Sequence, residues 1–398
     1  MSRLVQGVFI VGTKRTPFGT FGGKLVNSSI AELQTVAAKA ALTSANVPLE
    51  AVDSVIIGNV LTLASGDGAF MPRHVLLNCG IPIEKPAYLV NRLCGSGFQS
   101  IVNGIQEINT GASNIVLTGG VENMSAMPYA IRNARFGVPL GVSPVLEDTL
   151  WAGLTDTYCK LPMALTAEKL GEQYKITRDE VDEFSLRSQQ LWKQAQDAGR
   201  FKEEIVPIPV KVKKDTVNFE IDEHPRPQTT IEGLKKLPTL FKKNGVVTAG
   251  SASGVCDGAA AVVLASEEAA TKHNLKPLAR ILGYSVVGVE PSIMGIGPAP
   301  AIRNLLKVTG KSLNDIDLIE INEAFGAQTL ACAKELNLDL SILNVDGGAI
   351  ALGHPLGASG SRITGHLVNE LRRRKAKLGI GSACIGGGQG IAVMVEAL

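Results

Sequence analysis

The first third of the chain alternates short apolar runs with longer amphipathic stretches. The apolar runs at 7–12, 53–61 and 114–120 have the length and β-branched content of buried strands. Between them, the segments 29–45 and 94–111 carry apolar residues at helical spacing. Strands that alternate with helices predict parallel strands joined by helical crossovers.

The last third repeats this order. Strands are predicted at 278–288 and 315–324, helices at 297–310 and 359–375, and two strands around a glycine turn at 377–397. The sequence LEAVDSVIIGNVL (49–61) resembles LNDIDLIEINEAF (313–325), and the glycine-rich turn, helix and strand around Cys94 resemble those after His354. Two copies of one pattern predict paired halves in a layered α/β body.

The segment between the halves differs from them in composition and in its pattern of apolar residues. Residues 124–253 hold both tryptophans, a charged helical stretch at 178–196 and a Lys/Pro-rich stretch at 202–243. We expect an inserted loop domain here, because long insertions in layered folds commonly cover the active site. The N-terminal half then comprises 1–123 with 254–273, and the C-terminal half comprises 274–398.

Composition excludes several classes of protein. The net charge of +2 gives no basic field for nucleic acid, and no apolar run approaches the ~20 residues that span a bilayer, so neither nucleic-acid binding nor an integral membrane protein is expected. Six cysteines without a CxxC pair indicate a reduced compartment. The first acidic residue is Glu32, and an acid-poor, basic start is typical of mitochondrial import, although the same residues also predict a buried first strand. We expect the mitochondrial matrix, with the cytoplasm as the alternative.

Three glycine-rich segments each contain one reactive side chain. They are NRLCGSGFQS with Cys94, GGAIALGHPLGASG with His354 and SACIGGGQG with Cys384. Glycines leave bare backbone N–H groups free to face a ligand, as an oxyanion site requires. From composition alone, both cysteines could equally be small buried hydrophobes.

Cys94 directly precedes a predicted helix. The helix N-terminus favours thiolate and is expected to lower the pKa of Cys94. A cysteine nucleophile needs a base, and His354 is the histidine that lies in a glycine-rich loop between predicted elements. A metal site is not expected, because zinc ligands normally come in close pairs, whereas thirty residues separate His354 from Cys384.

Taken together, these motifs resemble the thiolase family over the whole chain. The joint occurrence of CGSGFQS, ENMSAMP, INEAFGAQ, GGAIALGHPLGASG and CIGGGQG is specific, although each glycine motif alone is not. The resemblance implies a five-layered αβαβα fold of two similar halves, with a loop domain that binds coenzyme A (CoA). It also implies a homotetramer, a dimer of dimers.

The resemblance further implies a catalytic role for five residues. Cys94 is similar to the nucleophile that takes the acyl group, and Cys384 to the acid/base that exchanges a proton with the acetyl-CoA enolate. His354 would activate Cys94 and donate into a first oxyanion hole, where Asn322 would hold a water. The backbone N–H groups of Cys94 and Gly386 would form a second hole.

Six further residues match the family's contacts to CoA and acyl-CoA thioesters. Those to the nucleotide and the pantetheine arm are Arg226, Thr229 and Ser253, and those of the apolar lining are Met163, Ala324 and Phe325. CoA is a substrate here, and neither a metal nor a separate cofactor is implied.

The implied reaction is thiolytic cleavage of a 3-ketoacyl-CoA by CoA, which gives acetyl-CoA and a shortened acyl-CoA in fatty acid β-oxidation. Its reverse is a Claisen condensation. Members specific for acetoacetyl-CoA are the alternative; many of these have a His-Met pair where this chain has Pro162-Met163. Two other classes remain: a condensing ketoacyl synthase, which lacks the second catalytic cysteine, and a non-catalytic scaffold with Cys94 buried.

Overall fold

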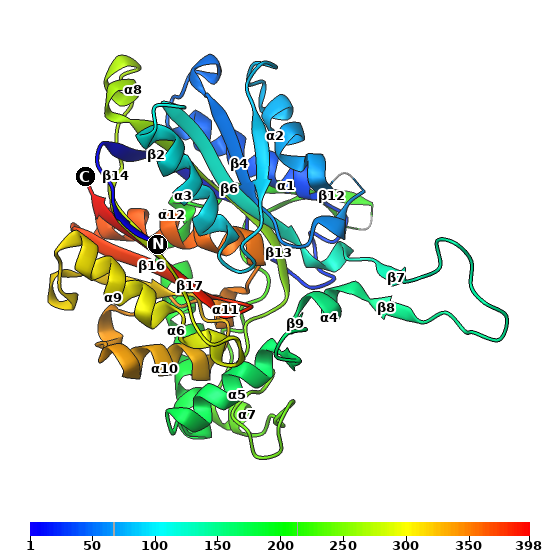
Figure 1. The fold of residues 1–398 in the computed structure, drawn as a ribbon. Helices are drawn as coiled ribbons and strands as arrows, with labels where there is room; N and C mark the ends of the chain where they lie inside the picture. Colours follow the sequence, from blue (N-terminus) through cyan, green and yellow to red (C-terminus); the bar gives the residue numbers. More distant parts are fainter. Residues whose placement is uncertain (67, 213) are drawn as a thin grey trace.

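Eleven strands form one mixed sheet in the computed structural model, which describes residues 1–66, 68–212 and 214–398. The strand order is β15-β16-β17-β14-β2-β13-β6-β4-β5, with β1 beside β14 and β3 beside β13 (Figure 1). The strand bounds are β1 Ser2–Leu4, β2 Val8–Arg15, β3 Gly19–Thr20, β4 Ser54–Gly58, β5 Ala87–Val90, β6 Ile115–Asn123, β13 Cys256–Ser266, β14 Ala279–Gly288, β15 Leu318–Ile321, β16 Leu378–Ile385 and β17 Gln389–Ala397.

The prediction of parallel strands holds for part of this sheet. β4 runs parallel to β5 and β6, and β15 runs parallel to β16. It is wrong for the middle of the sheet, where β13 is antiparallel to β2 and β6, and β17 is antiparallel to β14 and β16. The reason lies in the connections: β16 and β17 are joined by a short glycine turn, which only antiparallel neighbours allow.

Helices form three layers around the two halves of the sheet, as the five-layered arrangement predicts (Figure 1). One outer layer packs on the N-terminal half, a central layer lies between the halves, and another outer layer covers the C-terminal half. The outer layer on the N-terminal half contains α1 Ile30–Ser44 and α2 Met71–Cys79. The central layer contains α3 Ser96–Asn109 and α12 Leu356–Arg374, and the outer layer on the C-terminal half contains α9 Pro298–Thr309 and α10 Gly326–Leu336.

The strands are buried on both faces, which explains their continuous apolar character. In β13, Ala261 and Val263 pack against the outer helix layer, while Val262 and Leu264 pack against the central one. Successive side chains of a strand point to opposite faces, so both faces must be apolar when both are covered.

The central helices cross at glycines. A Cβ atom on Gly360 of α12 would lie 2.2 Å from the backbone nitrogen of Phe98 in α3, and one on Gly97 would lie 2.7 Å from the carbonyl oxygen of Gly357. Both helices begin directly after predicted reactive residues, α3 after Cys94 and α12 after His354. The close crossing therefore brings these two residues to the same end of the central layer.

Residues 124–253 form a region of small elements below and beside the sheet (Figure 1). Its bounds are β7 Tyr129–Ile131, β8 Leu146–Asp148, α4 Thr149–Gly153, β9 Thr155–Asp156, β10 Leu161–Pro162, α5 Met163–Gln173, α6 Arg178–Asp197, β11 Ile208–Val212, β12 Asp215–Phe219 and α7 Ile231–Lys235. Two short helices complete the fold, α8 Glu267–Lys272 and α11 Ala349–Leu352.

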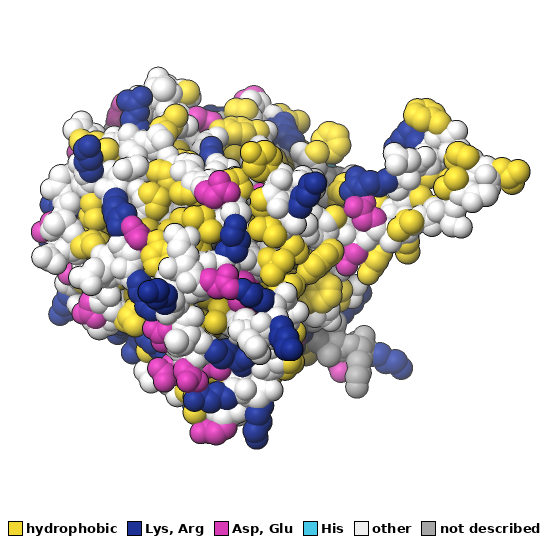
Figure 2. Space-filling model, turned by 60° about the horizontal axis from the view of Figure 1, so that its bottom comes forward, with side chains coloured by type: hydrophobic (Ala, Val, Ile, Leu, Met, Phe, Trp, Pro, Cys, Tyr) yellow, Lys and Arg dark blue, Asp and Glu magenta, His cyan; other side chains and the backbone are white. Residues whose placement is uncertain are grey.

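The hairpin β7–β8 projects from the body as an arm. Its tip carries exposed apolar side chains, among them Phe136, Leu140 and Val145. Figure 2 shows these apolar patches on the arm, while the face of the body in view mixes both signs of charge. In the described part of the chain, no helix has the length and apolar character needed to cross a membrane.

Candidate active site

A cavity of about 240 Å³ opens where the insertion meets the ends of the central helices. Cys94 and His354 both line it, so the fold brings together two residues that are 260 positions apart in sequence. The rest of the lining is mostly apolar: Met124, Trp151, Leu154, Pro162, Met163, Ala164, Leu240, Phe241, Ala252, Ser253, Gly254, Val255, Met294, Ala324, Phe325 and Leu356.

Cys94 sits in a strained turn before α3. Leu93 has a φ of 45°, which residues other than glycine seldom adopt and which costs roughly 1–3 kcal/mol. The turn is fixed by Asn91, whose Oδ1 accepts a hydrogen bond from the Leu93 N–H at 2.9 Å, and by Ser96, whose Oγ donates to the Leu93 carbonyl at 2.7 Å. Strain that is locked in this way is typical of a functional site.

The expected lowering of the Cys94 pKa is wrong for the resting protein. Burial raises the pKa of Cys94 to about 11, and the negative charge of Glu122 adds to the shift. Hydrogen bonds from the backbone N–H groups of Gly386 and Cys94 act in the opposite direction but are outweighed. Desolvation of the thiolate therefore dominates over the helix N-terminus, and Cys94 rests as a thiol.

His354 is buried and has one defined tautomer. Its Nδ1 lies 2.6 Å from Ser359 Oγ, and this hydroxyl donates its own proton to the Pro355 carbonyl at 3.1 Å. Ser359 must then accept from Nδ1–H, which leaves Nε2 as the nitrogen with a lone pair. Burial, together with the nearby positive charge of Arg362, lowers the pKa of His354 to about 3, so the imidazole is neutral at physiological pH.

Asn322 and Cys384 complete the polar centre. Asn322 Nδ2 lies 3.3 Å from His354 Nε2, and its Oδ1 accepts no hydrogen bond from the described residues. Cys384 is fully buried at the end of β16, and burial raises its pKa well above the ordinary value. Cys384 packs with Met294 and Ala324, which both line the cavity that contains Cys94.

Gly386 follows in the turn after β16. Its backbone N–H donates to the Cys94 sulfur, as noted above, and a Cβ atom here would lie 3.4 Å from Met163 Sδ. Two backbone N–H groups, those of Gly386 and Cys94, therefore converge on the Cys94 sulfur.

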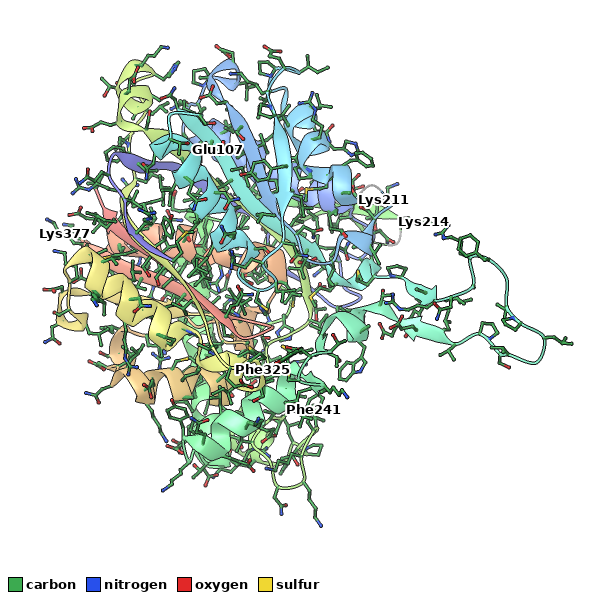
Figure 3. All side chains as sticks on the ribbon, in the orientation of Figure 1. Glu107, Lys211, Lys214, Phe241, Phe325 and Lys377 are labelled. Carbon is green, nitrogen blue, oxygen red and sulfur yellow. The ribbon has the colours of Figure 1, made fainter. Side chains whose placement is uncertain are left out.

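The predicted apolar lining also gathers at this cavity. Ser253 N donates to the Ala324 carbonyl at 3.0 Å, and Ala252 pairs with Phe325 in an isolated antiparallel bridge. In Figure 3, Phe325 and Phe241 lie at the junction of the insertion and the body. Phe241 stacks on Trp151 with centroids 6.3 Å apart, which closes the outer side of the cavity with aromatic surface.

A second cavity, of about 410 Å³, contains the other two predicted CoA contacts. Arg226 and Thr229 line it, with Gln189, His224, Gln228, Thr230, Gly233, Leu234, Leu237, Ala249, Gly250 and Ile350. It adjoins the first cavity through the segment 249–254, which contributes residues to both. Sequence reasoning missed His224 and Gln189, because neither stands in a glycine-rich motif.

Glu122 is another residue that sequence reasoning missed. Its buried carboxylate accepts hydrogen bonds from the backbone N–H of Leu61 at 2.8 Å and of Gly357 at 2.9 Å, and from Asn59 Nδ2 at 2.9 Å. Burial raises the pKa of Glu122 to about 7. The sequence signal that could have identified Glu122 is its place in the ENMS motif.

All six cysteines are free thiols. Within residues 1–66, 68–212 and 214–398, no group of three or more His, Cys, Asp or Glu side chains has a geometry that could hold a metal ion.

The fold and the site define a layered α/β protein with a cysteine centre for acyl transfer. Two family models cover nearly the whole chain: the thiolase N-terminal domain matches residues 8–268 and the thiolase C-terminal domain matches residues 275–397. The chain therefore belongs to the thiolase family.

Two similar proteins and one solved structure illustrate the relationship. The human mitochondrial 3-ketoacyl-CoA thiolase is 60% identical over 393 residues, which cover 99% of each chain. The acetyl-CoA acetyltransferase of Syntrophomonas wolfei is 44% identical over 399 residues, which cover 99% of this chain and 100% of the relative. The crystal structure of the human mitochondrial enzyme in complex with CoA superposes with a TM-score of 0.97, at 59% identity and with coverage of 100% of this chain and 99% of the other.

Proposed function

We propose that this protein is a 3-ketoacyl-CoA thiolase, an acyltransferase that cleaves a 3-ketoacyl-CoA with CoA through an acyl-Cys94 intermediate. The observation that carries the proposal is the single apolar cavity that contains Cys94 beside His354, with Asn322 and Cys384 adjoining. The 60% identical human relative, named a mitochondrial 3-ketoacyl-CoA thiolase, supports the same conclusion.

Acylation begins with attack of the Cys94 sulfur on the 3-keto carbon. Because the resting thiol has a raised pKa and His354 is neutral, proton transfer to Nε2 accompanies the attack rather than preceding it. The N–H groups of Cys94 and Gly386, which hydrogen-bond the Cys94 sulfur, would donate to the oxyanion of the tetrahedral intermediate.

Cleavage of the C2–C3 bond then releases an acetyl-CoA enolate. We infer that Asn322 and His354, whose Nδ2 and Nε2 atoms are 3.3 Å apart, stabilise the thioester oxygen of that enolate through a water held by Asn322. Cys384 donates its thiol proton to the enolate carbon. Its raised pKa keeps this proton in place until the enolate needs it.

The second half-reaction returns the acyl group to CoA. Free CoA gives its thiol proton to the Cys384 thiolate and attacks the Cys94 thioester. The departing Cys94 sulfur takes back its proton from His354 Nε2, so both thiols and the neutral imidazole are restored. Microscopic reversal of these steps is the Claisen condensation.

The two adjoining cavities fit the two ends of CoA. The apolar channel past Met163, Ser253 and Phe325 suits the pantetheine arm, and the cavity with Arg226 and Thr229 suits the nucleotide, because a guanidinium pairs well with phosphate. The human relative has a crystal structure in complex with CoA, which supports CoA as a ligand of this chain.

The test combines two cysteine variants with two assays. C94A is expected to abolish cleavage of acetoacetyl-CoA by CoA, while circular dichroism shows an intact fold. C384A is expected to retain acyl transfer from an activated thioester onto Cys94 but to lose carbon–carbon cleavage. Turnover by C94A, or equal loss of both steps in C384A, would contradict the assigned roles.

Acetoacetyl-CoA-specific thiolase is the second candidate, because family members of that type are 44–46% identical to this chain. A steady-state comparison of kcat/KM for short, medium and long 3-ketoacyl-CoA substrates separates the two. A broad or rising profile supports 3-ketoacyl-CoA thiolase, and activity confined to acetoacetyl-CoA supports the other.

We further propose a domain division, a location in the cell and an oligomeric state. The N-terminal half is 1–123 with 254–273, the loop domain that binds CoA is 124–253, and the C-terminal half is 274–398. The enzyme acts in the mitochondrial matrix in fatty acid β-oxidation, as the name of the human relative suggests.

The enzyme forms a homotetramer, a dimer of dimers. The edge strand β5 is available to pair with a second copy of the chain, and the apolar arm β7–β8 would contact the other dimer.

A further inference from the structure

Helix α6 of the insertion lies between the nucleotide cavity and the catalytic centre. Two consecutive buried residues of this helix face different parts of the site: Gln189 lines the nucleotide cavity, and Ser188 contacts the loop of Asn322. Both side chains are at least nine-tenths buried. Their hydrogen bonds therefore form in a low-dielectric interior, where losing one partner is costly.

Gln189 connects the nucleotide loop to the loop that leads to His354. Its Oε1 accepts a hydrogen bond from the Arg226 backbone N–H at 2.8 Å, and its Nε2 donates to the Ile350 carbonyl at 3.4 Å. His224 makes a parallel connection, since its Nδ1 lies 2.9 Å from the Ala351 carbonyl oxygen. The segment around Arg226 thus rests directly on α11, which ends two residues before His354.

Glu323 joins the same elements from the catalytic side. Its Oε2 accepts from Ser188 Oγ at 2.7 Å and from the Ile350 N–H at 3.1 Å, and its Oε1 accepts from Asn344 Nδ2 at 2.9 Å. Ser188 Oγ also accepts from the Gly348 N–H at 3.1 Å. Since Glu323 follows Asn322 in the chain, one buried carboxylate fixes the relative position of the Asn322 loop and the His354 loop.

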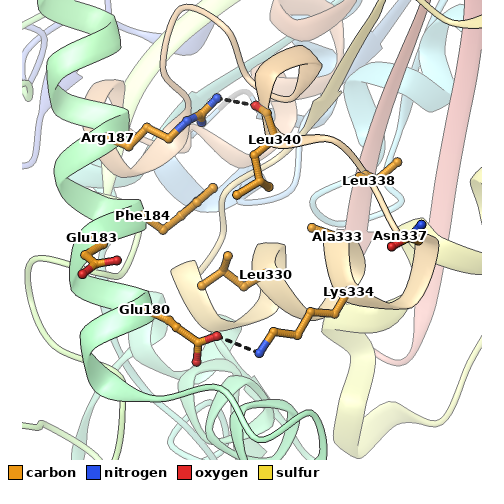
Figure 4. A pocket seen from close by; sticks show the side chains of 10 residues that line it. All are labelled: Glu180, Glu183, Phe184, Arg187, Leu330, Ala333, Lys334, Asn337, Leu338 and Leu340. Atoms are coloured by element: carbon orange, nitrogen blue, oxygen red, sulfur yellow. Dashed lines mark hydrogen bonds and ion pairs between the residues drawn. The ribbon is translucent and has the colours of Figure 1, made fainter.

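The opposite side of α6 is clamped to the body. Figure 4 shows Arg187 donating to the Leu340 carbonyl and Glu180 paired with Lys334 of α10, at 2.7 Å and 2.8 Å. Thr177 and Glu180 form a capping box at the start of the helix. A helix that is held at its start and along its outer side can act as a rigid frame for the residues on its inner side.

We propose that Ser188, Gln189 and Glu323 are positioning residues that couple the nucleotide cavity to Asn322 and His354, so that the nucleotide of CoA accelerates carbon–carbon cleavage as well as strengthening binding. The proposal rests on the proposed function. Its physical basis is that binding energy from a remote part of a substrate can be used to hold reacting groups in position.

The experiment compares full-length and truncated substrates. One pair is acetoacetyl-CoA with CoA; the other is S-acetoacetyl-N-acetylcysteamine with pantetheine, which lack the nucleotide. Q189A is expected to lower kcat about tenfold more with the CoA pair than with the truncated pair, relative to wild type. Q190A is the matched control, because Gln190 is the next residue of α6 and is exposed; it should change neither.

Two outcomes would overturn the coupling. If Q189A slows both substrate pairs equally, its role is general support of the fold. If it raises only the KM for CoA while kcat is unchanged, the nucleotide contributes affinity alone. Q189E keeps the acceptor for the Arg226 N–H but loses the donor to the Ile350 carbonyl, so it should not recover the kcat with CoA; full recovery would contradict the assigned connection to Ile350.

S188A and E323Q test the catalytic side of the same connection. Both are expected to slow the CoA and the truncated pair alike, about tenfold or more, because they loosen the Asn322 and His354 loops themselves. Unchanged kcat in both variants would contradict the positioning role. Absence of cleavage by the wild-type protein with any 3-ketoacyl thioester would instead refute the proposed function.

Discussion

Ser359 Oγ accepts a hydrogen bond from Nδ1 of His354 at 2.6 Å while it donates to the Pro355 carbonyl. One hydroxyl thereby fixes which imidazole nitrogen carries the proton. Without that constraint, either neutral tautomer is accessible, and only one of them presents a lone pair on Nε2.

S359A is therefore expected to lower kcat about hundredfold, at the lower end of the range that general acid–base catalysis contributes. The matched control is S361A on the same helix, since Ser361 donates to the Gly97 carbonyl rather than to the histidine. Steady-state kinetics with acetoacetyl-CoA and CoA check this. Equal losses in both variants would show that helix packing, not the tautomer, is the cause.

Cys94 should be slow to alkylate at neutral pH. Because burial raises its pKa to about 11, the thiolate fraction, and with it the rate of reaction with iodoacetamide, should increase by about tenfold per pH unit between pH 7 and pH 9. Mass spectrometry of the peptide that contains Cys94 follows the rate. A plateau below pH 8 would mean that the helix N-terminus outweighs desolvation after all.

His366 forms a buried charge cluster with Glu204, Asp346 and nearby Glu320, and Glu204 and Asp346 also pair with Arg15 and Arg200. These carboxylates raise the pKa of His366 well above 6.5, whereas the pKa values of Glu204 and Asp346 are lowered to about 2. The stabilisation from His366 is therefore fully present below pH 6.5 and is lost as pH rises through its folded-state pKa. It also declines in strong acid, as the two carboxylates become protonated.

H366Q should consequently lower the free energy of unfolding by roughly 1.5–3 kcal/mol near pH 6, because Glu204 and Asp346 keep Arg15 and Arg200 but lose the positive charge of His366. The difference from wild type should shrink at high pH. Urea denaturation over a pH series measures it, with H273Q as a control at a histidine outside this cluster. A difference that grows with pH would reverse the assigned sign.

G360A tests the close crossing of α3 and α12. The added methyl would meet the Phe98 backbone at 2.2 Å, and overpacking of this kind costs about 1–3 kcal/mol or more. We expect a lower melting temperature together with lower kcat, because the helices that follow Cys94 and His354 are pushed apart. G66A, where a Cβ meets nothing within 4 Å, should change neither property.

The arm β7–β8 should control assembly. F136D together with L140D places charges on its exposed apolar tip and should convert the proposed tetramer to a smaller species, as measured by light scattering after size-exclusion chromatography. Cleavage activity is expected to persist at low concentration, since neither residue lines either cavity. An unchanged mass would exclude the arm from the tetramer interface.

The sequence by itself determined the elements and their chemistry. Helices α1, α3, α9 and α12 begin and end within a few residues of the predicted spans, because their apolar residues recur at helical spacing. The glycine-rich motifs also pointed to Cys94, His354 and Cys384, because bare backbone donors beside a reactive side chain have a local signature.

Tertiary structure alone decided the rest. The direction of β13, the raised pKa of Cys94, and the places of Gln189, Glu323 and Glu122 depend on which distant segments pack together. The spacing of apolar residues indicates only which faces of a helix or strand are buried. It does not indicate which other segments cover those faces. Desolvation and long-range hydrogen bonds arise from those partners, so they become visible only once the chain is folded.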